Sequence, residues 1–233
     1  MNKLFFGLII ITVLLYSCNC EKGSGKTKLQ EYELEPFEGI VVKDIGTLNI
    51  AYAASPSITI ETDDNLLQFV EIKYKNNKIE ISINKCITSF TKLNINLSIP
   101  SFNYIEVSGD VDVICKDTFR IEELEISASD AGKINLWMNV NELSTKISDA
   151  SSVNLSGSAQ KHNIEIEDAG ILNAFKLITK TSYIEVSDAA HCMIFVNDKL
   201  DATVSDSGEL IYKGNPQKVN SNTTEAGKIK TEN

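Results

Sequence analysis

The sequence is poor in the cations that bind phosphate groups. It has a single arginine, Arg120, and its net charge is −10 at neutral pH. Nucleic acids and anionic lipid heads both attract clustered cations, which neutralise their phosphates. The composition therefore argues against nucleic acid and against anionic lipid heads as partners, and solubility accounts for the acidic surface.

Histidine is nearly absent, which limits acid–base chemistry. The two histidines, His162 and His191, have no serine or cysteine nucleophile motif beside them. We interpret both as surface or turn residues, and we predict no catalytic residue.

Cysteine is sparse in the body of the chain. Of the five cysteines, only Cys86, Cys115 and Cys192 lie beyond residue 30, and no pair of them has the spacing of metal ligands. An odd number also gives no disulfide framework. We predict three small, buried, apolar side chains, and a bridge between Cys86 and Cys115 stays open as an alternative.

Long apolar runs are missing except for one at the start. Residues 4–16 form an uncharged run of 13 residues after Lys3, which is shorter than the roughly 20 residues of a membrane span. Residues 15–18, Leu-Tyr-Ser-Cys, resemble a bacterial lipobox, in which the cysteine becomes the lipidated first residue. We predict a lipoprotein signal peptide over residues 1–17, with lipidation of Cys18. An ordinary cleavable signal peptide is the alternative.

The lipid would attach the protein to the cell envelope, and we expect the outer membrane. Cys20 is a poorer lipid site than Cys18, because Asn19 rather than a small residue precedes it. Residues 18–29 are mostly polar, and this composition favours a flexible tether between membrane and domain.

The sequence does contain an internal repeat. Segments of the form Asp-Ala-Gly, followed by an apolar residue, recur with acidic residues 19, 19, 20, 18 and 19 positions apart. These acidic residues are Asp130, Asp149, Asp168, Asp188, Asp206 and Glu225. Apolar residues alternate on both sides, as at Ile166 and Leu172, which predicts strand, corner, strand. The small residue after Asp-Ala suits a positive φ or a close approach of the next layer.

One such unit cannot fold alone, because its few apolar side chains do not offset the entropy lost on ordering about 19 residues. Stacking each unit on the next completes a shared core. Helical spacing is scarce, so we predict an all-β, parallel β-helix with about 19 residues per coil, within a domain of residues 30–233.

The N-terminal part of that domain is less regular. Asn76 and Asn77 lie between two alternating segments and predict a hairpin turn. Residues 63–69 resemble a short helical turn, and residues 93–99 alternate up to Pro100. We expect residues 30–100 to double as a cap that protects the first coil from edge pairing.

These segments together resemble a known family. Residues 37–40 (Phe-Glu-Gly-Ile), residues 64–67 (Asp-Asn-Leu-Leu), the hairpin, Ile99-Pro100 and the repeated Ser-Asp-Ala-Gly occur in this order. The order is similar to that of the auto-transporter adhesins with a head GIN domain, which are common in Bacteroidetes lipoproteins. The resemblance covers about residues 30–230. It implies a right-handed parallel β-helix and a role in adhesion, and it supplies no catalytic residues.

The repeated aspartates are the first candidate site. Stacked coils would place them in a column with a spacing of about 4.8 Å. The column would contain Asp130, Asp149, Asp168, Asp188 and Asp206. Carboxylates so arranged could hold Ca²⁺, but neighbours repel by only about 1 kcal/mol per pair in water and can accept hydrogen bonds from the turn. We favour the structural role, with calcium as the alternative, and predict no other metal or cofactor.

Two further groups could form a binding face. Stacking of amide groups at a corner is the favoured interpretation of Asn135, Asn154 and Asn173. Exposed aromatic rings could serve as platforms for sugars, although packing is favoured for most of them. These aromatic residues are Trp137, Phe175, Tyr183 and Phe195.

The leading functional hypothesis is a non-catalytic envelope lipoprotein that acts as an adhesin or binding module. Its partners would be the membrane, through the N-terminal lipid, and a glycan or protein ligand; the oligomeric state is left open. A polysaccharide lyase or hydrolase on the same fold is the first alternative. One arginine gives such an enzyme little to stabilise developing negative charge. The second alternative is a structural or sensory envelope protein that binds another protein.

Overall fold

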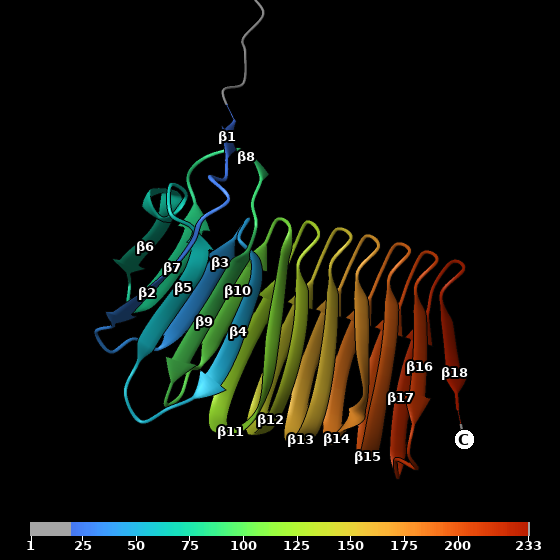
Figure 1. Ribbon diagram of the computed structural model, residues 1–233. Helices are drawn as coiled ribbons and strands as arrows, with labels where there is room; N and C mark the ends of the chain where they lie inside the picture. The colour runs from blue at the N-terminus through green and yellow to red at the C-terminus, as the bar shows by residue number, and fades with distance from the viewer. Residues whose placement is uncertain (1–19, 233) are drawn as a thin grey trace, which may run out of the picture.

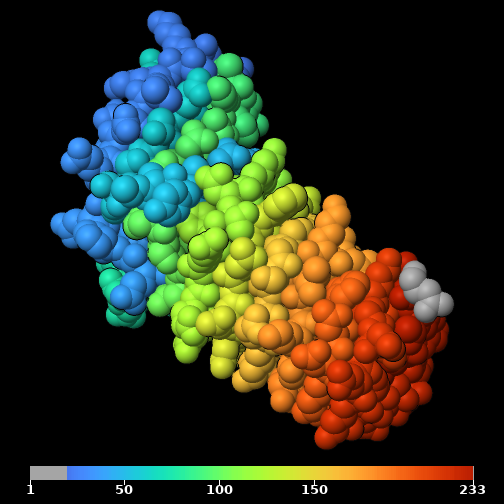
Figure 2. All heavy atoms as spheres, turned by 90° about the horizontal axis from the view of Figure 1, so that it is seen from below, coloured from blue at the N-terminus to red at the C-terminus, as the bar shows by residue number. Residues whose placement is uncertain are grey.

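The computed structural model describes residues 20–232, which form a β-solenoid of about seven turns with roughly 19 residues per turn. The coils stack along one axis, so the molecule is elongated, with its N-terminal and C-terminal parts at opposite ends (Figures 1 and 2). The predicted parallel β-helix is confirmed. The predicted signal peptide and Cys18 lie outside the described residues.

The regular coils consist of strands that pair in parallel with their counterparts in the next coil. They are β10 (Tyr104–Ser108), β11 (Val111–Ala128), β12 (Lys133–Ile147), β13 (Ser152–Ile166), β14 (Ile171–Val186), β15 (His191–Val204), β16 (Glu209–Lys213), β17 (Lys218–Thr223) and β18 (Lys228–Thr231). In β12 the alternation of buried and exposed positions is interrupted once, at the adjacent exposed residues Asn141 and Glu142.

The repeat length sets the register between coils. Ile134 pairs with Val153 and Val153 with Leu172, and the column continues through Cys192 and Leu210. All five side chains have 0% exposure. Because each repeat places its apolar residues over those of the previous one, the solenoid contains one continuous core.

The N-terminal part continues this stack and then closes it. Four strands extend the parallel pairing: β3 (Gly39–Lys43), β4 (Gly46–Tyr52), β7 (Lys78–Ile83) and β9 (Leu93–Ile99). Three others pair antiparallel at the end of the molecule: β2 (Thr27–Glu33), β5 (Ser57–Asp63) and β6 (Val70–Lys75). The expected cap is therefore present, and its antiparallel strands cover the first coil.

Local predictions in the cap are also confirmed. The hairpin of β6 and β7 turns at Asn76 and Asn77, whose φ angles of 52° and 61° are both positive, as in a type I′ turn. The short helical turn is the 3₁₀ helix η1 (Leu67–Phe69). Strand β9 ends at Ile99, directly before Pro100.

The cysteines differ in part from the prediction. Cys115 and Cys192 are free and buried, as expected. Cys86 is exposed and forms a disulfide with Cys20, so the interpretation of Cys86 as a buried apolar residue and the alternative bridge to Cys115 are both wrong. The prediction failed because it did not count Cys20 as part of the folded domain.

The segment expected to be a free tether, residues 18–29, is bound to the domain in its described part. The disulfide holds residue 20, and β1 (Glu21–Lys22) pairs in parallel with β8 (Ile87–Ser89). Strand β2 then begins at Thr27. Polar composition alone predicts flexibility, but here backbone pairing with β8 and β5 orders the segment.

The repeated turns place the positive φ at a different residue from the expected one. The aspartates have the positive angles, for example 60° at Asp130 and 58° at Asp168. The glycines that follow are needed for space instead. A Cβ added to Gly132 would lie 3.0 Å from Val107 Cγ1, and one added to Gly170 would lie 2.9 Å from Ile147 Cγ2. The close approach is thus confirmed, and the positive φ belongs to aspartate, which tolerates it better than most residues.

Candidate binding groove

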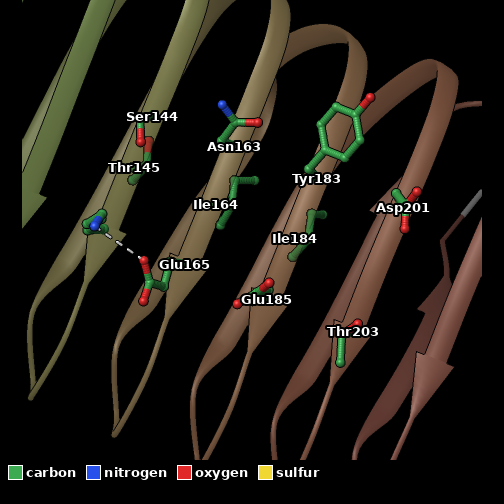
Figure 3. Close-up of a pocket in the computed structure, with 11 residues that line it drawn as sticks. Ser144, Thr145, Asn163, Ile164, Glu165, Tyr183, Ile184, Glu185, Asp201 and Thr203 are labelled. Atoms are coloured by element: carbon green, nitrogen blue, oxygen red, sulfur yellow. Dashed lines mark ion pairs between the residues drawn. The ribbon is translucent and has the colours of Figure 1, made fainter.

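The second half of strands β12 to β15 forms a polar face with a shallow hollow of about 340 Å³. Along β12, Thr145 and Ile147 point into the core, whereas Ser144 and Lys146 point outward. The same alternation in the next three coils brings two rows of outward side chains together (Figure 3). We call this surface the polar groove.

The two rows of the polar groove follow the strand register. The first row consists of Ser144, Asn163, Tyr183 and Asp201. The second row consists of Lys146, Glu165, Glu185 and Thr203. The rows lie on paired strands of one sheet, so their spacing is fixed by backbone hydrogen bonds rather than by loops.

Neighbouring hollows share residues with the groove and lengthen it. One contains Ser144 and Asn163 and extends to Tyr104. Another contains Glu165 and Glu185 and extends toward the turns. The polar face is therefore continuous along several coils, as an extended chain ligand would need.

Tyr183 is the aromatic residue of the groove, and its side chain is 38% exposed. The Lys199 Nζ atom lies 4.5 Å from the ring centroid and 3.3 Å from the hydroxyl oxygen. The Lys161 Nζ atom, on the neighbouring strand β13, lies 5.9 Å from the centroid. Both cations lie over the ring, and the exposed part of Tyr183 stays accessible to a ligand.

Charged groups in the groove are mostly paired. Lys146 Nζ lies 3.5 Å from Glu165 Oε2 (dashed line in Figure 3). Asp201 accepts a hydrogen bond from Asn220 and interacts with Lys199, and these contacts hold the pKa of its carboxyl below the usual range. The groove thus offers ionised acceptors, an amide and an aromatic ring side by side.

The predicted aspartate column exists, and it lies at the turns rather than in the polar groove. The N–H group of Asp130 donates to Asp149 Oδ2 at 3.2 Å, and that of Asp149 donates to Asp168 Oδ2 at 3.4 Å. Asp168 donates likewise to Asp188. The hydroxyl of Ser205 donates to Asp206, which lowers the pKa of that carboxyl. Each of these carboxylates therefore accepts a hydrogen bond from a backbone N–H group of the preceding coil.

The other predicted groups are scattered. Asn135, Asn154 and Asn173 do form one column, on the first half of their strands. Trp137 is 53% exposed and pairs with Ser156 outside the groove. Phe175 and Phe195 are half-buried. Of the four candidate aromatic platforms, only Tyr183 lies in the groove.

The two histidines have different environments. His191 lies on the surface, as expected, and its Nδ1 atom is 3.4 Å from Glu209 Oε2. His162 is fully buried, so its assignment to the surface is wrong. Its Nε2 atom is 2.9 Å from Thr145 Oγ1, and burial lowers the pKa of the ring to about 3. It occupies an inward position of the repeat, between Leu143 and Ser182 in register.

Sequence reasoning did not single out most groove residues. Asn163 and Glu165 stand five and three positions before Asp168, outward in the alternating pattern. The equivalent positions of the next coil, Tyr183 and Glu185, pair with them. Comparing outward positions between repeats would have revealed the rows, but not the hollow between them.

No three histidine, cysteine, aspartate or glutamate side chains converge on a metal position within residues 20–232. The same range contains no helix of the length and apolar character that a bilayer crossing requires.

A parallel β-solenoid with an extended polar groove on one sheet defines a class of repeat protein suited to display a binding surface. The sequence agrees with this class. Residues 36–216 match the family described as "Putative auto-transporter adhesin, head GIN domain". The chain belongs to this family, which suggests a cell-surface or envelope location. No curated protein matches it.

Several solved structures are similar to this chain. A "putative adhesin" from Bacteroides fragilis is 21% identical, with a TM-score of 0.86 over 91% of this chain and 100% of its own. A "putative adhesin" from Parabacteroides merdae is 22% identical, with a TM-score of 0.73 over 91% and 99%. A "putative lipid binding protein" from Parabacteroides distasonis is 15% identical, with a TM-score of 0.76 over 91% and 99%. At these identities the likeness shows the fold alone.

Proposed function

We propose that this protein is a non-catalytic, lipid-anchored adhesin or binding module of the cell envelope, and that its polar groove binds a glycan. The observation that carries the proposal is the groove itself, a continuous polar face built on paired strands over several coils. A rigid sheet of this kind binds an extended ligand without a large ordering cost.

The chemistry of the groove fits a sugar chain. Sugar hydroxyls donate to carboxylates and amides, which Asp201, Glu185 and Asn163 supply, and a sugar ring packs on an aromatic face such as that of Tyr183. The groove carries few free cations, because Lys146 is paired with Glu165. A neutral glycan therefore suits it better than a polyanionic one.

The Cys20–Cys86 disulfide supports export and anchoring. Disulfides persist in oxidising compartments such as the bacterial periplasm and the cell surface. A thiol in a disulfide cannot also carry a lipid, which favours Cys18 over Cys20 as the lipid site. We place the anchor in the outer membrane. Protease treatment of intact cells should remove the domain, whereas full protection would contradict surface display.

A glycan array followed by calorimetry with the best-bound glycan tests the ligand. Tyr183→Ala should weaken binding about tenfold, equivalent to about 1.4 kcal/mol, whereas Tyr183→Phe should retain most of it because the ring remains. Tyr32→Ala is the matched control, since Tyr32 lies on the cap with 39% exposure against 38% for Tyr183. If Tyr183→Ala bound the glycan as tightly as the wild type, the polar groove would not be the binding site. If no glycan on the array bound, the ligand would not be a glycan.

A further inference from the structure

The paired strands β1 and β8 project beyond the ends of the neighbouring strands at the N-terminal end of the solenoid (Figure 1). We call residues 20–25 and 85–92 the β1–β8 projection. It is the point where the described chain begins, and it contains the Cys20–Cys86 disulfide. Its place at one end of the molecule keeps it apart from the polar groove.

Hydrogen bonds join the two segments of this projection to each other and attach them to Asp63 of the cap. The N–H groups of Glu21 and Gly23 donate to Cys86 O at 2.7 Å and Ser89 O at 2.8 Å. The buried carboxylate of Asp63 then ties both segments together. It accepts from the N–H of Gly25 at 2.8 Å and from that of Thr91 at 2.7 Å. The projection is therefore a fixed part of the domain and cannot swing as a tether would.

Chain length limits how far the projection can stand from a lipid on Cys18. Only two peptide steps separate Cys18 from Cys20. Their Cα atoms are at most about 7 Å apart in any conformation, because an extended chain spans about 3.3–3.6 Å per residue. A lipidated Cys18 lies at the bilayer surface, so Cys20 and its partner Cys86 would lie within the headgroup region.

The exposed chemistry of the projection fits such a surface. Phe90 is 51% exposed, directly follows β8 and lies beside Gly23. Lys22 is exposed and Lys85 is half-exposed, although the chain as a whole is acidic. Aromatic rings favour the bilayer interface, and lysines near it attract lipid phosphates.

We infer that the β1–β8 projection contacts the lipid headgroup layer, with Phe90 at the interface and Lys22 and Lys85 facing the phosphates. The inference rests on the proposed lipid anchor at Cys18. It deepens the proposed function, because the solenoid would then be held on the bilayer at a fixed point rather than displayed on a flexible stalk.

Tryptophan quenching by brominated lipids tests the contact. The lipidated full-length protein is incorporated into vesicles of phosphatidylethanolamine and phosphatidylglycerol, with or without brominated acyl chains. The test variant combines Phe90→Trp with Trp137→Phe, and the wild type is the control, because Trp137 is its only tryptophan and is 53% exposed on the solenoid. We expect brominated lipid to lower emission about twofold or more in the test variant, because interfacial aromatics sit at headgroup depth, and to leave the wild type nearly unchanged.

The outcomes separate the contact from the anchor. Sedimentation with vesicles but no quenching in the Phe90→Trp variant would overturn the contact and leave the anchor standing. Failure of the lipidated wild type to sediment would overturn both. Replacing Cys20 and Cys86 by serine in the test variant should reduce quenching while sedimentation persists. Unchanged quenching would show that the disulfide is not what holds the projection there.

Discussion

At the scale of single residues, buried His162 links folding to pH. Its ring has a pKa of about 3 in the folded protein because burial disfavours the charged form, against about 6.5 in an unfolded chain. Between about pH 3 and about pH 6.5 the His162 ring is protonated in the unfolded chain but not in the folded protein. The free energy of unfolding is therefore highest above about pH 6.5 and decreases as the pH is lowered. We expect the free energy of unfolding to drop by about 2 kcal/mol from pH 7 to pH 5.

Urea denaturation of the wild type and of His162→Leu at both pH values measures this drop. Leucine occupies the positions in register one coil before His162, at Leu143, and two coils after it, at Leu200, so the variant should pack at this site. It should lose the pH dependence between pH 7 and 5. The same drop in the variant would assign it to another group. Carboxyls with lowered pKa, such as Asp63, lose their contribution only at lower pH.

Each aspartate of the column adopts a positive φ angle and also accepts hydrogen bonds through its carboxylate. Asp149 has a φ of 56° and accepts hydrogen bonds from the Asp130 N–H and the Ser148 hydroxyl. Asp149→Ala should destabilise the protein by about 1–3 kcal/mol, because alanine is less tolerant of left-handed backbone and cannot accept. Asp149→Asn keeps an acceptor and tolerates positive φ, so denaturant midpoints should show a change within about 0.5 kcal/mol.

We further propose that this column is structural rather than a calcium site. Its carboxylates already accept backbone N–H groups of the preceding coil. Calorimetric titration with millimolar calcium should give no saturable heat for the wild type. A saturable heat that Asp149→Asn abolishes would establish the calcium alternative instead.

At the scale of elements, close stacking of coils leaves no room for side chains at a few backbone positions. Gly157 in β13 has a φ of 117°, and a Cβ there would lie 1.9 Å from Met138 O in the adjacent strand. Gly157→Ala should lower stability by about 3 kcal/mol or more, since both strain and a backbone clash arise. Gly25→Ala is the control, because its φ is also positive but nothing lies within 4 Å. Thermal unfolding should show a much smaller loss there, and equal losses would mean that strain alone matters.

The strands and their register could be predicted from the sequence because the same positions are apolar in each successive repeat unit. Ile134, Val153 and Leu172 share a place in successive units and meet in one column. The buried histidine could not be predicted this way, because a polar residue at an inward position looks like an irregularity in the pattern. The polar groove could not be predicted either, because the alternation shows which side chains point outward but not the depth of the hollow between neighbouring rows.

At the scale of the whole molecule, stability depends on contacts between neighbouring coils, so a local change should have a local effect. The Cys20–Cys86 disulfide closes a sequence separation of 66 residues within the cap. Closing a loop of that length stabilises by about 4 kcal/mol in the chain-entropy model. The coils from β12 onward lie outside the loop and gain nothing directly.

Replacing Cys20 and Cys86 by serine should therefore loosen one end of the rod and leave the rest intact. Amide hydrogen exchange should become faster in β2 and β5, where the cap pairs antiparallel, and stay unchanged in β13 and β14, four or more strands further along the stack. Reduction of the wild type should reproduce this pattern. If exchange became faster along the whole solenoid, the coils would be unfolding as one cooperative unit, and the nearest-neighbour description of this fold would be wrong.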